Sequence, residues 1–201
     1  MKLPAPLQTV VDELAELPSI GPRQAIRLAF HLISEGRQNI QGLASSIADL
    51  SKIKVCERCF FIHQNEGGRC DICKNPNRSQ KVIMVVEKET DLISLENTGK
   101  FAGNYFIIGE ISKTGMLDEA QKLRLASLKA RLANGDGANK AEEIILAFNP
   151  TSLGDLQASL LTKELASFTK KISRLGRGLP TGGEIEFADD ETLGAAMERR
   201  S

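Results

Sequence analysis

The four cysteines of the chain form two C-x-x-C pairs, Cys56 with Cys59 and Cys70 with Cys73. A C-x-x-C turn directs two thiolates at one point, and two such turns supply the four tetrahedral ligands that zinc prefers. The ten residues between the pairs, 60–69, contain asparagine and glycine, which suit the tight turn of a zinc knuckle. Because the cysteines fill every ligand position, the spacing predicts one structural zinc ion. Two disulfides or four unrelated buried thiols are the alternatives.

The chain has two histidines, His31 and His63. His31 falls within an apolar helical pattern, so we expect it to pack against other residues. His63 lies between the cysteine pairs and could serve as a spare zinc ligand, although four cysteines leave no need for one.

A turn rich in proline and glycine, LPSIGPR at residues 17–23, separates two helical patterns and predicts a helix-hairpin-helix. Gly21 precedes the second helix, whose first N–H groups could hold a DNA phosphate. Arg23 and Arg27 lie one helical turn apart and could add charge along one DNA backbone, independently of base sequence. A plain helical hairpin with two solvated arginines is the alternative.

Two acidic residues follow predicted strands in the second half of the chain. Glu87 ends one apolar run, and Asp155 comes shortly after another. Open α/β sheets place their sites at the carboxyl ends of parallel strands, where carboxylates could hold Mg²⁺ for phosphoryl chemistry. Alternatively, Asp155 caps or begins the next helix and Glu87 is a solvated strand end.

A glycine-rich stretch, RGLPTGG at residues 177–183, could cradle a phosphate, but it lacks the G-K-[ST] ending of a P-loop. A connecting loop is the alternative interpretation. The acidic residues that follow, 184–190, are expected to form a solvated strand edge and the start of a helix.

The elements that must position these residues differ between the two halves of the chain. Before the cysteines, apolar residues at helical spacing predict helices over 7–17, from Pro22 to near Gly36, and over about 40–50. After them, short apolar runs predict strands over 81–87, 105–108, 143–148 and 171–175. Helical stretches over 89–97, 117–133 and 155–168 alternate with these strands, and 134–137 is a loop. This alternation predicts a parallel α/β sheet.

Composition limits the class of protein. The 201 residues are 41% hydrophobic and carry no formal net charge, so the chain has enough apolar residues for a core and no general basicity. No apolar run is long enough to span a bilayer, and the N-terminus lacks the apolar centre of a signal peptide. We expect a cytoplasmic protein with reduced thiols.

Five motifs occur in a characteristic order: LPSIGPRQAIRLAFHL, the two C-x-x-C pairs, KVIMVVE, AFNPT and RGLPTGGEIEFADDETL. Over almost its whole length the chain resembles the RecR family of bacterial recombination mediators. The resemblance implies an α+β multi-domain protein with a helix-hairpin-helix N-terminal domain, a four-cysteine zinc finger, and an α/β Toprim domain whose sheet is mainly parallel. The expected bounds are 1–54, 55–79, 80–176 and, for a C-terminal segment, 177–201.

The resemblance also assigns residues. It places zinc on the four cysteines and DNA contact on Gly21, Arg23 and Arg27. It matches Glu87 to the first Toprim acid and Asp155 to the last acid of the second acidic motif.

The chain departs from the family pattern at several positions. Ser19 stands where the family usually has the first hairpin glycine, and Leu153 stands where it usually has a glutamate. The cysteine pairs are ten residues apart where eight is usual. Residues 109–117 lack the family's loop rich in proline and glycine, so the partner surface of the Toprim domain is altered.

The resemblance implies a non-enzymatic, DNA-binding protein that forms a homodimer or homotetramer. With RecO, and in many species RecF, it would promote loading of RecA onto single-stranded DNA covered by single-strand-binding protein. The alternative is an Mg²⁺-dependent Toprim nuclease or topoisomerase-like enzyme. Leu153 argues against that alternative, because such chemistry needs clustered carboxylates.

Overall fold

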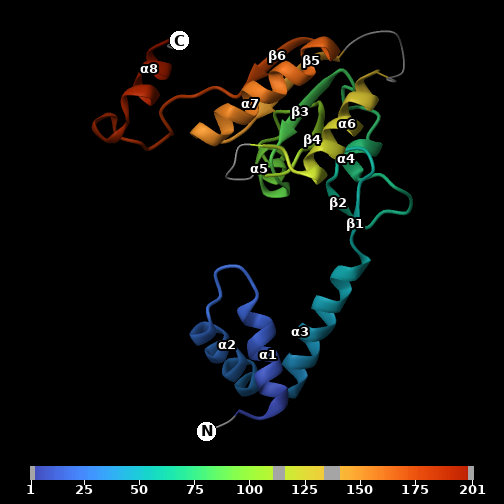
Figure 1. The fold of residues 1–201 in the computed structure, drawn as a ribbon, viewed down its shortest axis with the longest axis vertical. Coiled ribbons are helices and arrows are strands. Elements are labelled where there is room, and N and C mark those ends of the chain that lie inside the picture. Colours follow the sequence, from blue (N-terminus) through green and yellow to red (C-terminus); the bar gives the residue numbers. More distant parts are fainter. Residues whose placement is uncertain (1–2, 111–115, 134–140, 199–201) are drawn as a thin grey trace. The chain divides into compact units, whose positions relative to one another are not determined.

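The computed structural model describes residues 3–110, 116–133 and 141–198. The chain divides into two compact units, Met1–Ile53 and Lys54–Ser201, and each is described by itself (Figure 1). The loop predicted at 134–137 lies outside the described residues, as do residues 111–115 of the stretch that departs from the RecR pattern.

The first unit is helical, with α1 (Ala5–Ala15), α2 (Pro22–Glu35) and α3 (Arg37–Asp49) followed by the short 3-10 helix η1 (Leu50–Lys52). Pro22 occupies the first turn of α2, where its fixed φ and missing N–H cost nothing. Gly36 ends α2 with a φ of +88°, a conformation that favours glycine. The predicted helical hairpin is therefore confirmed.

Small side chains let α1 and α2 approach closely. Ala25 and Ala29 of α2 are buried together with Val11 of α1. Larger apolar residues pack around this contact: Leu7, Leu14 and Ile20. The buried side of α2 is thus its alanine side, which leaves its charged residues exposed.

The second unit begins with the cysteine segment. Its short strands β1 (Lys54–Val55) and β2 (Ile62–His63) pair antiparallel, and the one-turn helix α4 (Asp71–Lys74) follows. The sequence predicted a zinc knuckle here but did not predict these two strands and the helix.

The rest of this unit is the predicted α/β domain. Its four strands are β3 (Val82–Val86), β4 (Asn104–Ile107), β5 (Ala141–Ala147) and β6 (Thr169–Arg174). They lie in the order β4-β3-β5-β6, and all three neighbouring pairs are parallel. The expected parallel sheet is confirmed, with strand ends that differ from prediction by one or two residues.

Helices and the cysteine segment cover the two faces of the sheet. Alternate residues of β3 point to opposite sides, Ile83 and Val85 to one and Met84 and Val86 to the other. The first side packs against α6 (Glu119–Ala133) and α7 (Ser152–Leu165). The second packs against α5 (Glu89–Glu96) and against Phe61 and Ile72 of the cysteine segment. Because the central strand is apolar on both sides, the core lies on both faces of the sheet.

The chain after β6 differs from prediction in one respect. We expected a strand edge within the acidic residues 184–190, but they contain the 3-10 helix η3 (Ile185–Phe187), and α8 (Asp190–Glu198) begins at their end. The strand prediction is wrong because Ile185 and Phe187 are highly exposed and pair with no neighbouring strand in the described sheet. Before β6, residues 166–168 form the 3-10 helix η2 (Ala166–Phe168), where the sequence predicted the end of α7.

Candidate metal centre and nucleic-acid interface

The four cysteines meet in one buried cluster. Their Sγ atoms all lie within 4.8 Å of one another, and none of the four residues is more than 4% exposed. The Sγ atoms of Cys59 and Cys70 are 3.5 Å apart, well beyond a disulfide bond, and all four thiols are free. Four converging sulfur atoms with no other ligand type suit a tetrahedral structural zinc ion.

Hydrogen bonds fold the first C-x-x-C turn around this point. The Cys56 N–H donates to the Phe61 carbonyl at 2.8 Å, and the Phe60 N–H donates to the Cys56 carbonyl at 2.9 Å. Phe60 has a φ of +65°, which is unusual for a bulky residue. Its ring packs edge-on against Phe106 of β4, with the ring centres 5.4 Å apart. The strained turn is thus tied to the sheet through this ring contact.

The thiols perturb one another strongly. A hydrogen bond from Cys59, followed by one from Cys73, lowers the pKa of Cys70 far below the usual thiol value. The hydrogen bond with Cys70, with contributions from Cys73 and burial, raises the pKa of Cys59. A divalent cation bound to this cluster would replace the protons that the thiols share.

The histidines do not join the cluster. His63 is buried, and its Nδ1 accepts a hydrogen bond from the Asn65 N–H at 3.1 Å, but the metal-binding group in the described residues consists of the cysteines alone. The prediction that His31 packs inside is wrong, because it is exposed and its Nε2 lies 3.9 Å from Glu35. The buried side of α2 consists of alanines, and His31 falls outside it.

The N-terminus of α2 is open to solvent. Gly21 precedes the helix, and no side chain in the described residues caps it. A Cβ atom built on Gly21 would meet no described atom within 4 Å, and its φ of −84° suits any residue. The fold therefore gives no internal reason for a glycine here. Its missing side chain leaves room for an external group to approach the first N–H groups of the helix.

Arg23 and Arg27 are both exposed on α2, one turn apart and next to this helix end. Ser19, in the turn before it, has a φ of +66°. The turn thus keeps the left-handed conformation that a glycine adopts easily, although serine stands there. The chain departs from the family pattern in residue type but not in the backbone conformation that glycine favours.

The two candidate Toprim acids have different surroundings. Glu87 follows β3 and is half-buried, and its Oε2 accepts a hydrogen bond from Asn149 at 3.0 Å. Burial raises the pKa of Glu87, and the charges of Asp91 and Glu110 raise it further. Glu87 is therefore a half-buried, hydrogen-bonded residue and not a fully solvated strand end.

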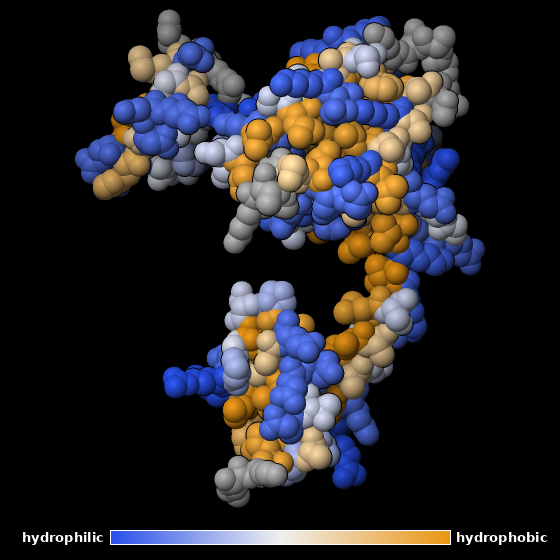
Figure 2. Space-filling model, in the orientation of Figure 1, coloured by the Kyte–Doolittle hydropathy of each residue, from blue (hydrophilic) through white to orange (hydrophobic). Residues whose placement is uncertain are grey.

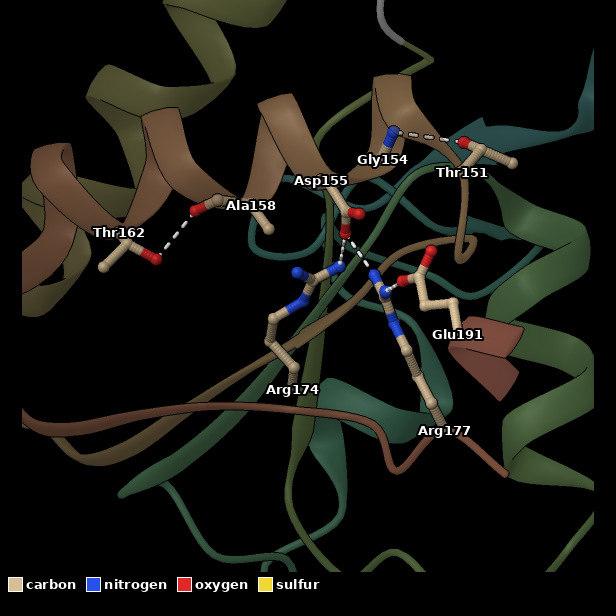
Figure 3. Close-up of polar contacts among 8 residues, drawn as sticks. All are labelled: Thr151, Gly154, Asp155, Ala158, Thr162, Arg174, Arg177 and Glu191. Atoms are coloured by element: carbon tan, nitrogen blue, oxygen red, sulfur yellow. Dashed lines mark hydrogen bonds and ion pairs between the residues drawn. The ribbon is translucent and has the colours of Figure 1, made fainter. Parts of the chain in front are cut away.

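Asp155 lies in the first turn of α7, between two arginines (Figure 3). Its Oδ1 accepts from Arg174 at 2.5 Å and also from Arg177, which in turn contacts Glu191 of α8. The hydrogen bond from Arg174 is the main cause that lowers the pKa of Asp155. Two guanidinium groups thus form ion pairs with the carboxylate that a Toprim enzyme would present to Mg²⁺.

Sequence reasoning missed these partners. Arg174 and Arg177 line a cavity of about 500 Å³ at the carboxyl ends of β5 and β6, together with Asn149 and Glu191. The cap of α7 is Thr151, whose Oγ1 accepts from the Gly154 N–H, and not Asp155. The T-x-x-G spacing could have indicated this cap, because threonine is a preferred N-cap residue.

A helical hairpin, a four-cysteine knuckle and a parallel Toprim sheet in this order define a class of nucleic-acid-processing protein. Comparison with known families agrees. The family described as RecR, helix-hairpin-helix, matches residues 7–50, the Toprim domain matches 81–176, and RecR, C-terminal, matches 178–201.

Relatives match over nearly their full length. The recombination protein RecR of Frankia alni is 38% identical over 196 residues, covering 96% of this chain and 95% of the relative. That of Chloroflexus aggregans is 40% identical over 199 residues, covering 98% and 93%. The chain belongs to the RecR family of recombination proteins.

No helix in the described residues is long and apolar enough to cross a membrane.

Proposed function

We propose that this chain is a non-enzymatic, DNA-binding recombination mediator. Acting with RecO, and with RecF where that protein is present, it would promote loading of RecA onto single-stranded DNA covered by single-strand-binding protein. We assign it to the cytoplasm, in association with the nucleoid. The observation that carries DNA binding is the open N-terminus of α2, where an unobstructed glycine and two exposed arginines lie together.

The chemistry of such a contact is simple. Phosphate accepts hydrogen bonds from the uncapped N–H groups of the first turn, and Arg23 and Arg27 add ionic contacts. None of these groups reads a base edge, so the contact is independent of DNA sequence.

A salt series tests this proposal. We would measure binding of a labelled gapped duplex by fluorescence anisotropy for wild type and for Arg23→Ala with Arg27→Ala. We expect weaker binding to every sequence and a slope of log K against log salt that flattens by roughly one unit per lost contact. Arg37→Ala, an exposed arginine at the start of α3, is the matched control. A double variant that bound with the wild-type slope would refute the assignment.

We propose that Cys56, Cys59, Cys70 and Cys73 hold one structural Zn²⁺, supported by their convergence and near-complete burial. The ion would contribute directly to folding of the knuckle and would activate no substrate. Metal analysis of the purified protein tests this, with one zinc per chain as the expected result.

We propose that the chain performs no phosphoryl chemistry, because Asp155 is paired with two arginines and Leu153 presents no carboxylate beside it. A denaturing gel of labelled DNA incubated with Mg²⁺ or Mn²⁺ tests this directly. Metal-dependent cleavage that disappears in Glu87→Gln would instead establish the Toprim-enzyme alternative.

We propose a homodimer or homotetramer as the working form. Apolar residues recur along one stripe of α3 and at the first residue of η1, and they remain substantially exposed (Figure 2): Ile40, Leu43, Ile47 and Leu50. Ile185 and Phe187 are also highly exposed in the second unit. Apolar stripes of this kind favour association with a second copy. Sedimentation of wild type and of Ile47→Glu tests this proposal. A wild-type protein that is monomeric at all concentrations would refute it.

We retain the division into 1–54, 55–79, 80–176 and 177–201. The first boundary lies one residue from the division between the compact units after Ile53, and the family matches support the spans of the first, third and fourth parts.

A further inference from the structure

Arg131 of α6 is a partly buried cation without a carboxylate partner in the described part of the chain. Its Nη1 donates to the Arg58 carbonyl at 3.2 Å. Its Nη2 is buried and has no hydrogen-bond partner among the described residues. A buried charge is costly unless another group compensates it, so a nearby anion would stabilise this guanidinium.

The surroundings of Arg131 identify that anion. Arg58 lies between Cys56 and Cys59, so the carbonyl that holds Arg131 belongs to the first C-x-x-C turn. Burial and the nearby Arg58 charge lower the pKa of Arg131 to about 10, whereas the charges of Cys73, Cys59 and Cys56 raise it. Arg131 is therefore a cation held against the backbone of the first C-x-x-C turn.

The charge of a loaded cluster has the sign that Arg131 needs. Four thiolates carry four negative charges and a zinc ion two positive ones, which leaves two negative charges in a buried site. We infer that Arg131 is the charge partner of the zinc–thiolate cluster. Its unpaired Nη2 would interact with the negative charge of the cluster when zinc is bound. This inference rests on the zinc assignment proposed above.

A second arginine on the same helix provides a contrast. Arg124 lies about two turns before Arg131 and contacts the same turn, with its guanidinium 5.0 Å from the centre of the Phe60 ring. Its Nη1 lies 3.4 Å from the Ile107 carbonyl, so in the described residues it contacts a ring and a carbonyl. Arg124 therefore packs against the knuckle without compensating the thiolates.

Three variants separate charge compensation from packing. Arg131→Met keeps much of the side-chain volume and removes the charge, Arg131→Lys keeps the charge with a single donor group, and Arg124→Met is the matched packing control. For each, we would measure zinc content and then the transfer of zinc to a chelator of known affinity.

Removing an outer partner of a metal ligand typically weakens metal binding by 10–100-fold, and we expect a loss of about that size for Arg131→Met. We expect a smaller loss, about threefold to tenfold, for Arg131→Lys and less than about threefold for Arg124→Met. Wild-type zinc affinity in Arg131→Met would overturn the inference. If Arg131→Met does not fold, an unchanged affinity in Arg131→Lys overturns it equally.

Melting temperatures add a measurement that a packing role would not reproduce. Charge compensation predicts that Arg131→Met lowers the melting temperature more in the zinc-loaded protein than in the zinc-free protein, which loses only the hydrogen bond to the Arg58 carbonyl. Equal losses with and without zinc would show a packing role and overturn the inference. Wild type purified without zinc and unable to take it up would instead refute the zinc assignment, so the two failures are distinguishable.

Discussion

Gly21→Ala is the most specific test of the proposed DNA contact. It should block the approach of a phosphate to α2 while leaving the free energy of unfolding nearly unchanged. The backbone of Gly21 (φ −84°, ψ 166°) suits alanine, and the added Cβ would meet no described atom within 4 Å. Restricting the unfolded chain should stabilise the protein by about 0.4–1 kcal/mol. Alanine is a poorer N-cap residue than glycine, which should cost about 0.5–1 kcal/mol. These terms offset, so we expect the free energy of unfolding to change by less than about 1 kcal/mol.

The effect on DNA should be much larger than the effect on folding. The new methyl group would occupy the space through which a phosphate reaches the first N–H groups of α2. A hydrogen bond to a charged group is worth about 1.5–3 kcal/mol, which corresponds to a loss of roughly 10–150-fold in affinity. Because no charge is removed, the salt slope should change less than in the Arg23 and Arg27 double alanine.

Fluorescence anisotropy with a gapped duplex, together with urea unfolding, measures both quantities. Gly42→Ala is the matched control, since a Cβ there also meets no described atom within 4 Å but the residue lies inside α3. We expect this control to gain about 1 kcal/mol of stability and to bind DNA like wild type. If Gly21→Ala bound DNA as tightly as wild type, no phosphate could lie against the α2 N-terminus.

Three of the four further predictions concern single residues, and the fourth concerns the whole cysteine cluster. Ser19→Gly should raise the free energy of unfolding by about 1 kcal/mol in urea titrations, because serine carries the cost of a positive φ; no gain would mean that the turn is relaxed. Gly154→Ala should destabilise the second unit by about 1–3 kcal/mol in thermal melts, since its Cβ would lie 2.1 Å from the Asn149 carbonyl oxygen; Gly178→Ala, where a Cβ meets no described atom within 4 Å, is the control. Cys56→Ser should lose zinc by metal analysis and melt at a lower temperature, and a variant that kept both values would exclude Cys56 as a ligand. Zinc binding should also weaken as the pH falls, because protons compete for the thiolates; titration with a chelator at several pH values measures this.

Local signals predicted most of this fold and failed where partners are distant in sequence. The C-x-x-C pairs, Pro22 and the apolar run of β3 each act within a few residues, and the structure has the elements that they predict. The Asp155 contacts join residues 19 and 22 positions apart, and the Arg131 contact spans 73 positions. No periodicity encodes such pairs. The candidate Mg²⁺ ligand Asp155 is therefore one member of an ion-pair network with Arg174, Arg177 and Glu191.

The conformation of Ser19 shows a different limit. Ser19 differs in residue type from the family's usual glycine, yet its φ of +66° lies in the left-handed region that glycine adopts easily. Sequence indicated the departure from the family pattern, but only the backbone showed how the fold absorbs it.

The position of β4 gives the cysteine segment a consequence beyond its own stability. β4 is an edge strand with no charged residue, and its Ile107 N–H donates to the Cys59 carbonyl at 2.9 Å. The opposite edge strand, β6, carries exposed Lys170 and Lys171, which discourage pairing with another chain. The sheet thus protects one border by charge and the other by the cysteine turn. In a cell that cannot supply the metal, chains whose apolar edge strand β4 is uncovered would then accumulate. These chains would aggregate before a loss of DNA-binding function was detected.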